Sequence, residues 1–359
     1  MWMAGYAGRT GPSEGVELDL YAKVLVLMDG DGQRLAFVTL DLIGVPRSLR
    51  SSLAEKAKER FGIAPSHLVL NASHTHSGPE LKSSRLHGVD DVPLREREAA
   101  EYVAALEGTL LRMLGEAIDG SRPALVDFCS ARCGFAINRR TPDGKGGWKN
   151  FPNPAGPVDH RVPVLRVNGQ EGGEIAVMFG YACHCTTLGH QKFSGDYAGY
   201  AKERLETSHP GVVALFMNGC SGDQNPYPRR TMELAEIHGT TLATAVEAAL
   251  TTTMRPLAPT VHASYGEIPL EYDRVPTRDE LEGDRKSKDK WTAIHAERVL
   301  RRLDEDGPLP KDYPYPVQVL RIGGELTWVT LGGEVVIDYV FRIERELRDS
   351  LVWVSAYSN

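Results

Sequence analysis

The chain has 359 residues, of which 42% are hydrophobic and 25% charged, and its formal net charge is −7 at pH 7. These proportions are ordinary for a folded globular protein, and the negative charge gives no basis for nucleic-acid binding, which usually needs a basic surface. No apolar run approaches the length of a membrane span, and five cysteines, an odd number, argue against a disulfide framework.

The first half of the chain alternates strand-like and helix-like patterns. Apolar and β-branched runs predict strands over residues 21–28, 35–42, 68–72 and 124–129. The first two flank Asp29-Gly30-Asp31-Gly32, a turn sequence that predicts a hairpin. Helical spacing of apolar residues predicts helices over residues 46–61 and 95–118. Residues 141–157 are expected to form a long loop, in which Trp148 and Phe151 either line an apolar substrate mouth or anchor the loop.

The second half continues this alternation. Predicted strands cover residues 162–167, 175–182, 212–217, 261–270, 317–322 and 326–331. Predicted helices cover residues 232–250, 279–303 and 335–347, and a further helix is expected to start at residue 200. Because hairpins alternate with long helices, the sequence predicts an α/β fold with mixed β-sheets and flanking helices. No Pro/Ser-rich linker interrupts the pattern, so we expect a single domain over residues 1–359.

Two short stretches place histidines where an apolar strand gives way to a polar loop. They are Asn71-Ala72-Ser73-His74-Thr75-His76-Ser77-Gly78-Pro79 and Tyr181-Ala182-Cys183-His184-Cys185-Thr186-Thr187. On an extended backbone His74 and His76 point to the same side, and His184 adds a third imidazole. Three histidines could begin a catalytic zinc site at strand ends. Alternatively they are hydrogen-bonded structural residues, since His-x-His also occurs by chance, and the two cysteines beside His184 are expected to be small buried fillers.

A wider set of motifs extends this pattern. His74-Thr75-His76-Ser77-Gly78-Pro79 resembles the His-Thr-His-Ser-Gly-Pro signature of the neutral/alkaline (non-lysosomal) ceramidase family, zinc amidases that cleave N-acyl sphingosines. Further segments resemble the N-terminal catalytic domain of this family in the same order: residues 138–142, the His184 segment, and residues 194–201, 218–226 and 331–334. The ordered set runs over nearly the whole chain and is more specific than any single motif.

The resemblance implies a set of metal ligands. His74, His184 and Glu334 would bind a Zn²⁺ ion, and His76 would lie beside the metal in contact with the substrate or the attacking water. Glu334 is also expected at the N-terminus of the helix over residues 335–347, where the helix dipole favours a carboxylate. Without the resemblance, Glu334 would be interpreted as a helix cap.

Four further residues are expected near the substrate. The resemblance implies that Arg139 or Arg140 lies near the scissile carbonyl, with Arg139 interpreted as catalytic and Arg140 as substrate-binding. Asp223, which follows a glycine in a loop, is also expected to bind the substrate; the alternatives are that it holds a histidine ring, binds a structural cation or forms an Asx turn. The family's Gly-Asp-x-Ser-Pro motif reads Gly222-Asp223-Gln224-Asn225-Pro226 here. A serine nucleophile is therefore hard to sustain, and Asn225 is expected to hydrogen-bond the substrate in a pocket unlike that of a true ceramidase.

A carboxylate also ends one of the first strands. Asp41 closes the strand over residues 35–42, where two roles are open. It could orient a zinc-binding histidine through the second ring nitrogen, or it could cap the helix that begins near Pro46.

The ends of the chain bear on two further expectations. The family's fourth metal ligand is a tyrosine that follows a segment like residues 354–359, so we expect it beyond Asn359, and Tyr357 does not align with it. The chain is expected to be truncated at both ends and to lack the C-terminal immunoglobulin-like module of many ceramidases. Residues 1–6 are not a signal peptide, which predicts a cytoplasmic location if the N-terminus is complete, and a secreted or periplasmic one if a signal segment is missing.

Taken together, these features predict a zinc-dependent hydrolase that cleaves an N-acyl amide, either a ceramide-like lipid or a related amide, with a metal-activated water. The expected partner is a small-molecule or lipid amide, with no nucleic acid, no transmembrane segment and no obligate protein partner. One alternative is a metal-dependent hydrolase of another ester or amide on the same scaffold. The other is a non-catalytic relative that binds lipid amides, which the replaced serine makes credible.

Overall fold

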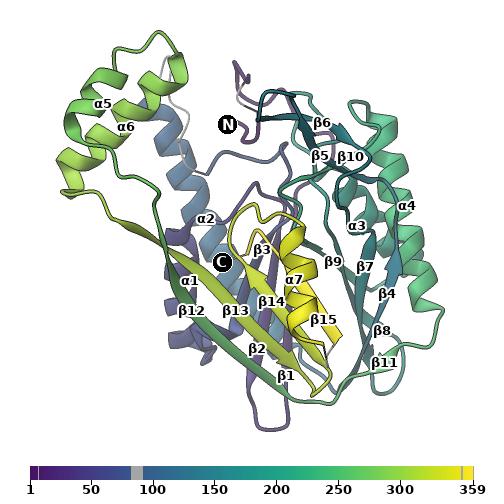
Figure 1. The fold of residues 1–359 in the computed structure, drawn as a ribbon. Coiled ribbons are helices and arrows are strands. Elements are labelled where there is room, and N and C mark those ends of the chain that lie inside the picture. Colours follow the sequence, from purple (N-terminus) through teal and green to yellow (C-terminus); the bar gives the residue numbers. More distant parts are fainter. Residues whose placement is uncertain (7, 82–91, 349–350, 359) are drawn as a thin grey trace.

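A computed structural model describes residues 1–6, 8–81, 92–348 and 351–358. Four β-sheets form the centre of the molecule, and most of the helices pack on their outer faces (Figure 1). The sheets contain both parallel and antiparallel neighbours, which confirms the predicted α/β fold with mixed β-sheets and flanking helices. Within the described part of the chain, no helix is long and apolar enough to cross a membrane.

The first sheet has the strand order β1-β2-β3 and is covered by two helices. Its strands are β1 (Ala22–Met28), β2 (Arg34–Leu40) and β3 (Leu68–Ala72), and the covering helices are α1 (Arg47–Phe61) and α2 (Val92–Asp119), with a short 3₁₀ turn, η1 (Pro65–His67), before β3. β1 and β2 pair antiparallel, as the hairpin prediction requires, and β3 runs parallel to β2. Helix α1 ends at Gly62, whose φ of 67° is the left-handed conformation that glycine adopts readily.

The second large sheet has the order β11-β4-β7-β8-β9. Its strands are β4 (Ala124–Arg132), β7 (Arg161–Gly169), β8 (Glu174–Tyr181), β9 (Val213–Asn218) and β11 (Arg255–Pro256). Helices α3 (Asp196–Ser208) and α4 (Met232–Leu250) pack together and cover its outer face, at the right of Figure 1. All five cysteines are free and four of them are buried, including the two beside His184.

A small sheet contradicts the prediction of a long loop over residues 141–157. Strand β5 (Ala136–Pro142) pairs antiparallel with β6 (Trp148–Asn153) and with β10 (Gln224–Pro226). The Pro- and Gly-rich composition marks the turn of this hairpin rather than a loop throughout, because backbone pairing with β5 imposes the strand. Trp148 and Phe151 on β6 are 66% and 67% exposed, so neither anchors the segment.

The fourth sheet has the order β12-β13-β14-β15 and carries α7 on its outer face. Its elements are β12 (Val261–Glu271), β13 (Asp312–Ile322), β14 (Leu326–Leu331), β15 (Leu351–Ser355) and α7 (Asp338–Glu346). The predicted hairpin between β13 and β14 is confirmed. β14 and β15 run parallel, as do β8 and β9.

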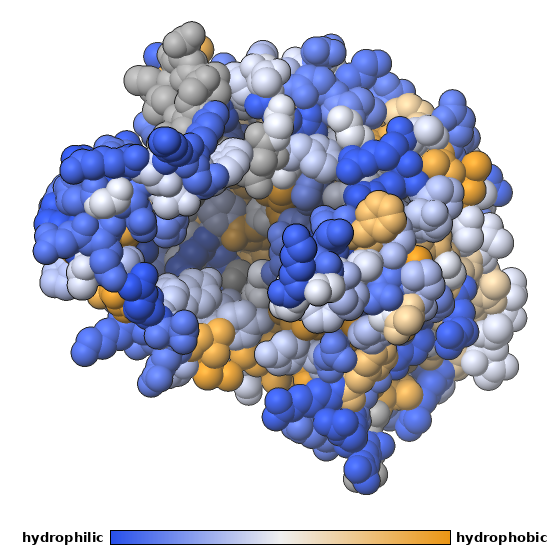
Figure 2. Space-filling view, turned by 45° about the horizontal axis from the view of Figure 1, so that its top comes forward, coloured by the Kyte–Doolittle hydropathy of each residue, from blue (hydrophilic) through white to orange (hydrophobic). Residues whose placement is uncertain are grey.

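The single helix predicted over residues 279–303 is wrong, because two helices occupy this region. They are α5 (Arg278–Asp284) and α6 (Lys290–Asp306). Each helix has its own N-cap, since Thr277 forms a capping box with Glu280 and the Asp289 side chain accepts from the amide of Thr292. The two helices form a lobe at the upper left of Figure 1, and Figure 2 shows a hollow in the surface beside this lobe.

The three larger sheets share one core. Alternate residues of β2 face opposite sides, so that Phe37 points into the space between the sheets while Val38 packs toward α1 and α2. The indole rings of Trp328 and Trp353 stack with their centroids 3.7 Å apart, and Phe37 lies 5.1 Å from Trp328. This aromatic stack fixes β14 and β15 against β2, and so fixes where each of these strands ends.

Candidate metal centre

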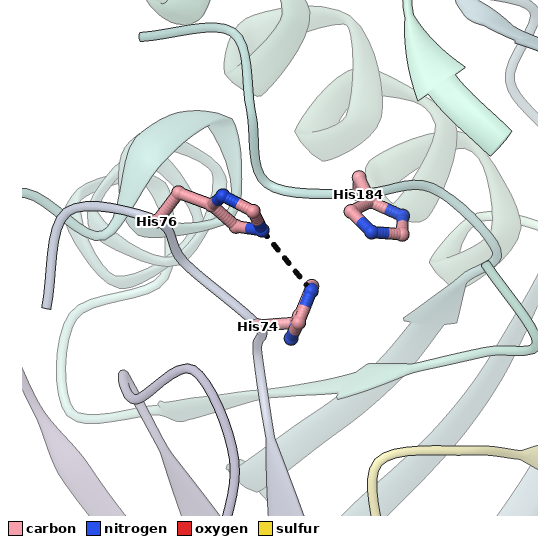
Figure 3. Close-up of side chains that lie close together, drawn as sticks. All are labelled: His74, His76 and His184. Atoms are coloured by element: carbon pink, nitrogen blue, oxygen red, sulfur yellow. Dashed lines mark hydrogen bonds between the residues drawn. The ribbon is translucent and has the colours of Figure 1, made fainter. Parts of the chain in front are cut away.

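Strands from three different sheets end close together at the candidate site. His74 follows β3, His184 follows β8 and Glu334 follows β14. Two buried asparagines join the end of β3 to the end of β9, the neighbour of β8. Asn71 Oδ1 accepts from the amide of Asn218 at 2.8 Å, and Asn218 Nδ2 donates to the carbonyl of Ser73 at 3.0 Å. Figure 3 shows the three histidine rings facing one another from two separate segments.

The nitrogen and oxygen atoms at this site are within reach of a single ion. His74 Nε2 lies 3.1 Å from His76 Nε2 and 3.5 Å from Glu334 Oε1, and His184 Nε2 lies 3.3 Å from Glu334 Oε2. The ligand atoms of the three histidines all lie within 4.8 Å of one another. The structure thus brings together the three ligands expected from the sequence, with His76 beside them.

Backbone carbonyls fix the tautomers of the two rings that face Glu334. His74 Nδ1 donates to the carbonyl of Ile43 at 2.5 Å, and His184 Nδ1 donates to the carbonyl of Ser221 at 2.6 Å. In a neutral imidazole the other nitrogen then has a lone pair and no proton. Both Nε2 lone pairs therefore face a carboxylate, an arrangement that is repulsive unless a cation lies between them. This donor set fits a Zn²⁺ ion.

The pKa values of these groups favour metal binding at neutral pH. Burial lowers the pKa of His74 to about 3 and also lowers the pKa values of His76 and His184. Burial raises the pKa of Glu334, but the contacts with His184 and His74 outweigh this effect and lower it to about 2. The imidazoles are therefore neutral and the carboxylate is ionised, which are the protonation states that a metal requires.

The predicted placement of Glu334 at a helix N-terminus is wrong. Helix α7 begins at Asp338, and Glu334 lies in the turn after β14 with a side chain that is 51% exposed. The turn is shaped by Gly333, whose φ is 68°, and by a hydrogen bond from the amide of Gly222 to the carbonyl of Val335 at 2.8 Å. Contacts between loops, rather than a helix dipole, position this carboxylate.

Of the two candidate arginines, Arg139 contacts the carboxylate of Glu334. Its Nη2 lies 3.4 Å from Glu334 Oε2, while Nε and Nη2 donate to the carbonyl of Gly222 at 3.1 and 2.7 Å. Arg140 donates through Nη2 to the same carbonyl at 3.2 Å. Asp223 accepts from Asn138 Nδ2 at 2.9 Å through one oxygen and from the amide of Ile337 at 3.0 Å through the other.

Comparisons with known proteins identify the family. Residues 1–232 match the family described as neutral/alkaline non-lysosomal ceramidase, N-terminal. The chain belongs to this family. Of the three expected metal ligands, His74 and His184 lie within the matched range and Glu334 lies beyond it.

Curated relatives cover part of the chain. Neutral ceramidases B and A of Dictyostelium discoideum are 24% and 23% identical to it over 249 and 250 residues, and neutral ceramidase 1 of Arabidopsis thaliana is 22% identical over 246 residues. These alignments cover 63%, 63% and 66% of the chain, and 33%, 34% and 31% of the relatives. The chain therefore spans about a third of the length of the curated relatives it matches.

The fold is that of a solved ceramidase. The crystal structure of neutral ceramidase from Pseudomonas aeruginosa superposes with a TM-score of 0.73 at 18% identity, covering 99% of this chain and 64% of that one. A structure described as ceramidase complexed with C2 gives a TM-score of 0.74 at 17% identity, covering 99% and 65%.

Asn225, which stands where the resemblance expects a serine, links the site to the β5–β6 hairpin. Its Oδ1 accepts from Arg139 Nη1 at 3.4 Å and from Thr186 Oγ1 at 3.3 Å. Its Nδ2 donates to Asn150 Oδ1 on β6 at 3.3 Å. The Asn225 side chain can contact Arg139 and Asn150 at once because its oxygen accepts hydrogen bonds and its nitrogen donates them.

Both roles considered for Asp41 are wrong. Its oxygens accept from Lys202 Nζ at 2.7 and 2.6 Å, and one also accepts from the amide of Tyr21 at 2.9 Å. The ring of His74 is instead oriented by the carbonyl of Ile43, two residues further along the chain. The buried Lys202 on α3 forms an ion pair with the Asp41 carboxylate, and the sequence around Asp41 does not indicate this tertiary contact.

Two tyrosines near the histidines were missed. The ring of Tyr357 lies 4.3 Å from that of His74, and its hydroxyl accepts from Ser221 Oγ at 2.9 Å. The ring of Tyr6 lies 4.9 Å from that of His76. The sequence contains a weak signal for Tyr357, because residues 354–359 resemble the family segment that precedes the ligand tyrosine. No motif near Tyr6 indicates that it lies at the site.

Proposed function

We propose that this chain is a metal-dependent amide hydrolase in which His74, His184 and Glu334 bind one Zn²⁺ ion. The observation that carries the proposal is the pair of imidazole lone pairs directed at a carboxylate, at 3.5 and 3.3 Å. Relatives that are named neutral ceramidases support an N-acyl amide as the substrate, either a ceramide-like lipid or a related amide.

A bound Zn²⁺ ion would lower the pKa of a water molecule and polarise a carbonyl oxygen. The side chains around the ion would transfer the protons and stabilise the negative charge that develops on the carbonyl oxygen. His76 is neutral, because burial lowers its pKa, and it accepts a proton from the attacking water as the water oxygen bonds to the carbonyl carbon. Arg139 donates to the oxygen on which negative charge develops. When the C–N bond breaks, His76 returns the proton to the leaving amine.

Two further residues would hold the substrate in the proposed reaction, and a third supports them. Asn225 would hydrogen-bond the substrate next to Arg139, which it already contacts. Arg140, which donates to the carbonyl of Gly222, would contact the substrate beside Arg139. Because both oxygens of Asp223 already accept hydrogen bonds from the protein, its contribution is to hold β5 and the turn after Glu334 in place.

The metal site is tested by measuring zinc in protein purified without added metal. We expect about one zinc per chain in the parent protein and loss of zinc in His74→Ala and Glu334→Gln. His262→Ala and Glu305→Gln, at exposed positions outside the site, are the matched controls and should retain it. A parent protein that binds no zinc even when zinc is offered would refute the hydrolase and favour a non-catalytic relative that binds amides.

The bond that is cleaved is tested with matched amide and ester substrates of the same acyl chain. Hydrolysis of the amide by the zinc-loaded protein, lost in Arg139→Ala with zinc still bound, would support the proposal. Cleavage of the ester alone would show that the scaffold serves another reaction.

A further inference from the structure

Three arginines gather beside the candidate metal centre. The guanidinium carbons of Arg9 and Arg230 each lie 5.4 Å from the centroid of the Tyr6 ring, and this ring lies 4.9 Å from that of His76. Arg229 is next to Arg230 in the sequence and is partly buried. The protein thus concentrates positive charge at this point although its net charge is −7.

No carboxylate of the described residues pairs with any of these arginines. Arg9 donates to uncharged oxygens, including the carbonyls of His76 and His190, and Arg230 donates to the Tyr6 hydroxyl at 3.3 Å. Within the described residues, no ion pair involves any of the three. Burial lowers the pKa of Arg229, and the positive charge of Arg230 lowers it further. Arg9 and Arg229 are half-buried and Arg230 is exposed. Like charges this close repel one another, and an anion bound beside them would relieve the repulsion.

A surface pocket of about 430 Å³ opens next to this cluster. It is lined by Leu188, Gly189, His190, Arg230, Thr231 and Met232. A Cβ at Gly189 would lie 2.9 Å from Arg230 Nη1. The backbone at this position does not require glycine, so the missing side chain serves to seat the guanidinium.

The polar groups of this pocket are mainly hydrogen-bond donors. Thr231 caps α4, so the first amides of that helix, which begins at Met232, lie at the pocket. His190 Nδ1 accepts from the amide of Lys192 at 3.1 Å, so in the neutral ring Nε2 carries the proton, and Nε2 is buried with no partner among the described residues. Glu233, the acid in the first turn of α4, is exposed and does not line the pocket.

We infer that this pocket binds an anionic group, a carboxylate or a phosphate, through Arg230 and the start of α4. Resting on the proposed function, this inference narrows the substrate class to amides that carry a negative charge a few bonds from the scissile carbonyl. The distance between the negative charge and the scissile carbonyl follows from the position of Tyr6, because a single tyrosine ring lies between Arg230 and His76. Arginine and a helix N-terminus are both common ligands of carboxylates and phosphates.

The test compares two amides that differ in one group. N-dodecanoylglycine carries a carboxylate, and N-dodecanoylethanolamine carries a hydroxyl at the same place. We expect the zinc-loaded protein to favour the glycine conjugate in kcat/KM. Arg230→Gln should lower the ratio of the two kcat/KM values by about tenfold or more, as expected for the loss of a charge-assisted hydrogen bond. A change that merely disturbs the fold would lower both values and leave their ratio intact.

Two further variants keep the comparison decisive. Arg301→Gln, at an exposed position on α6, is the matched control and should keep the ratio. Gly189→Ala should displace the Arg230 side chain and lower the ratio without removing a charge. A ratio that is the same in Arg230→Gln and the parent protein would overturn the assignment of the pocket to the substrate.

Inorganic phosphate separates a substrate site from a site for a free anion. Calorimetric titration should show phosphate binding to the parent protein that is lost in Arg230→Gln, whereas phosphate bound to zinc would persist in the variant. Loss of phosphate binding together with an unchanged substrate ratio would assign the pocket to a free anion and overturn the substrate class. If neither amide is hydrolysed, the proposed function fails, and the phosphate titration still decides whether the pocket binds anions.

Discussion

Replacing Lys202 by methionine should destabilise the protein by about 3–5 kcal/mol, because it leaves a buried carboxylate without its partner. Lys202 Nζ donates to the two oxygens of Asp41 at 2.7 and 2.6 Å, and both residues are 3% exposed. After the change Asp41 keeps the bond from the Tyr21 amide, which cannot neutralise its charge. The expected loss is a large fraction of the roughly 5–15 kcal/mol that stabilises a typical domain.

Urea unfolding followed by circular dichroism measures this loss through the midpoint and the slope of the transition. Lys192→Met is the control, since Lys192 pairs with Glu17 at 3.0 Å in an exposed position and its loss should cost about 0–1 kcal/mol. Adding Asp41→Asn to Lys202→Met should recover part of the stability by removing the orphan charge. If Lys202→Met and Lys192→Met destabilise equally, the buried pair does not hold the end of β2.

Two other predictions concern the metal centre directly. In Gly222→Ala a Cβ would lie 2.3 Å from the backbone oxygen of Glu334, so this variant should lose zinc, whereas Gly30→Ala, with nothing within 4 Å, should retain it in the same metal analysis. The second prediction is that zinc affinity, measured by competition with a chelator, falls much less than about a thousandfold between pH 7.5 and 5. Two imidazoles with ordinary pKa values would lose about a thousandfold. Burial lowers the pKa of His74 to about 3 and also lowers the pKa of His184, so protons compete with zinc for these nitrogens less than they do for ordinary imidazoles. A thousandfold fall would contradict this reasoning.

The parts of the site that could be predicted are those that local sequence determines. His74 and His184 each follow a buried strand, and a run of apolar residues ending in a polar loop marks such a position without knowledge of the fold. The hairpin of β13 and β14 is equally local, because Gly323 and Gly324 form its turn. Glu334 could be named from its motif, but its position depends on contacts with the loop that contains Gly222.

What could not be predicted depends on residues far apart in the sequence. Lys202 reaches Asp41 from α3, across 161 positions of the chain, and Tyr6 meets His76 through an N-terminal segment without regular pattern. The break between α5 and α6 was missed because a continuous charged pattern hid the N-cap at Asp289. Composition predicts a loop where β6 lies, because pairing with β5, rather than composition, determines the conformation of this segment.

The structure separates the residues that would hold the metal from those that would select the substrate. His74 and His184 follow β3 and β8, two strands of the shared core, so the buried part of the molecule sets where these two ligands lie. The turn that carries Glu334 follows β14 of the same core and is held by the loop that contains Gly222. The groups proposed to face a substrate come instead from the β5–β6 hairpin, the loop before α4 and the N-terminal segment. Changes in these loops can alter which amide is accepted while the ligand geometry stays fixed. Asn225 fits this division, since it joins Arg139 to Asn150 on the hairpin and contacts no proposed ligand directly.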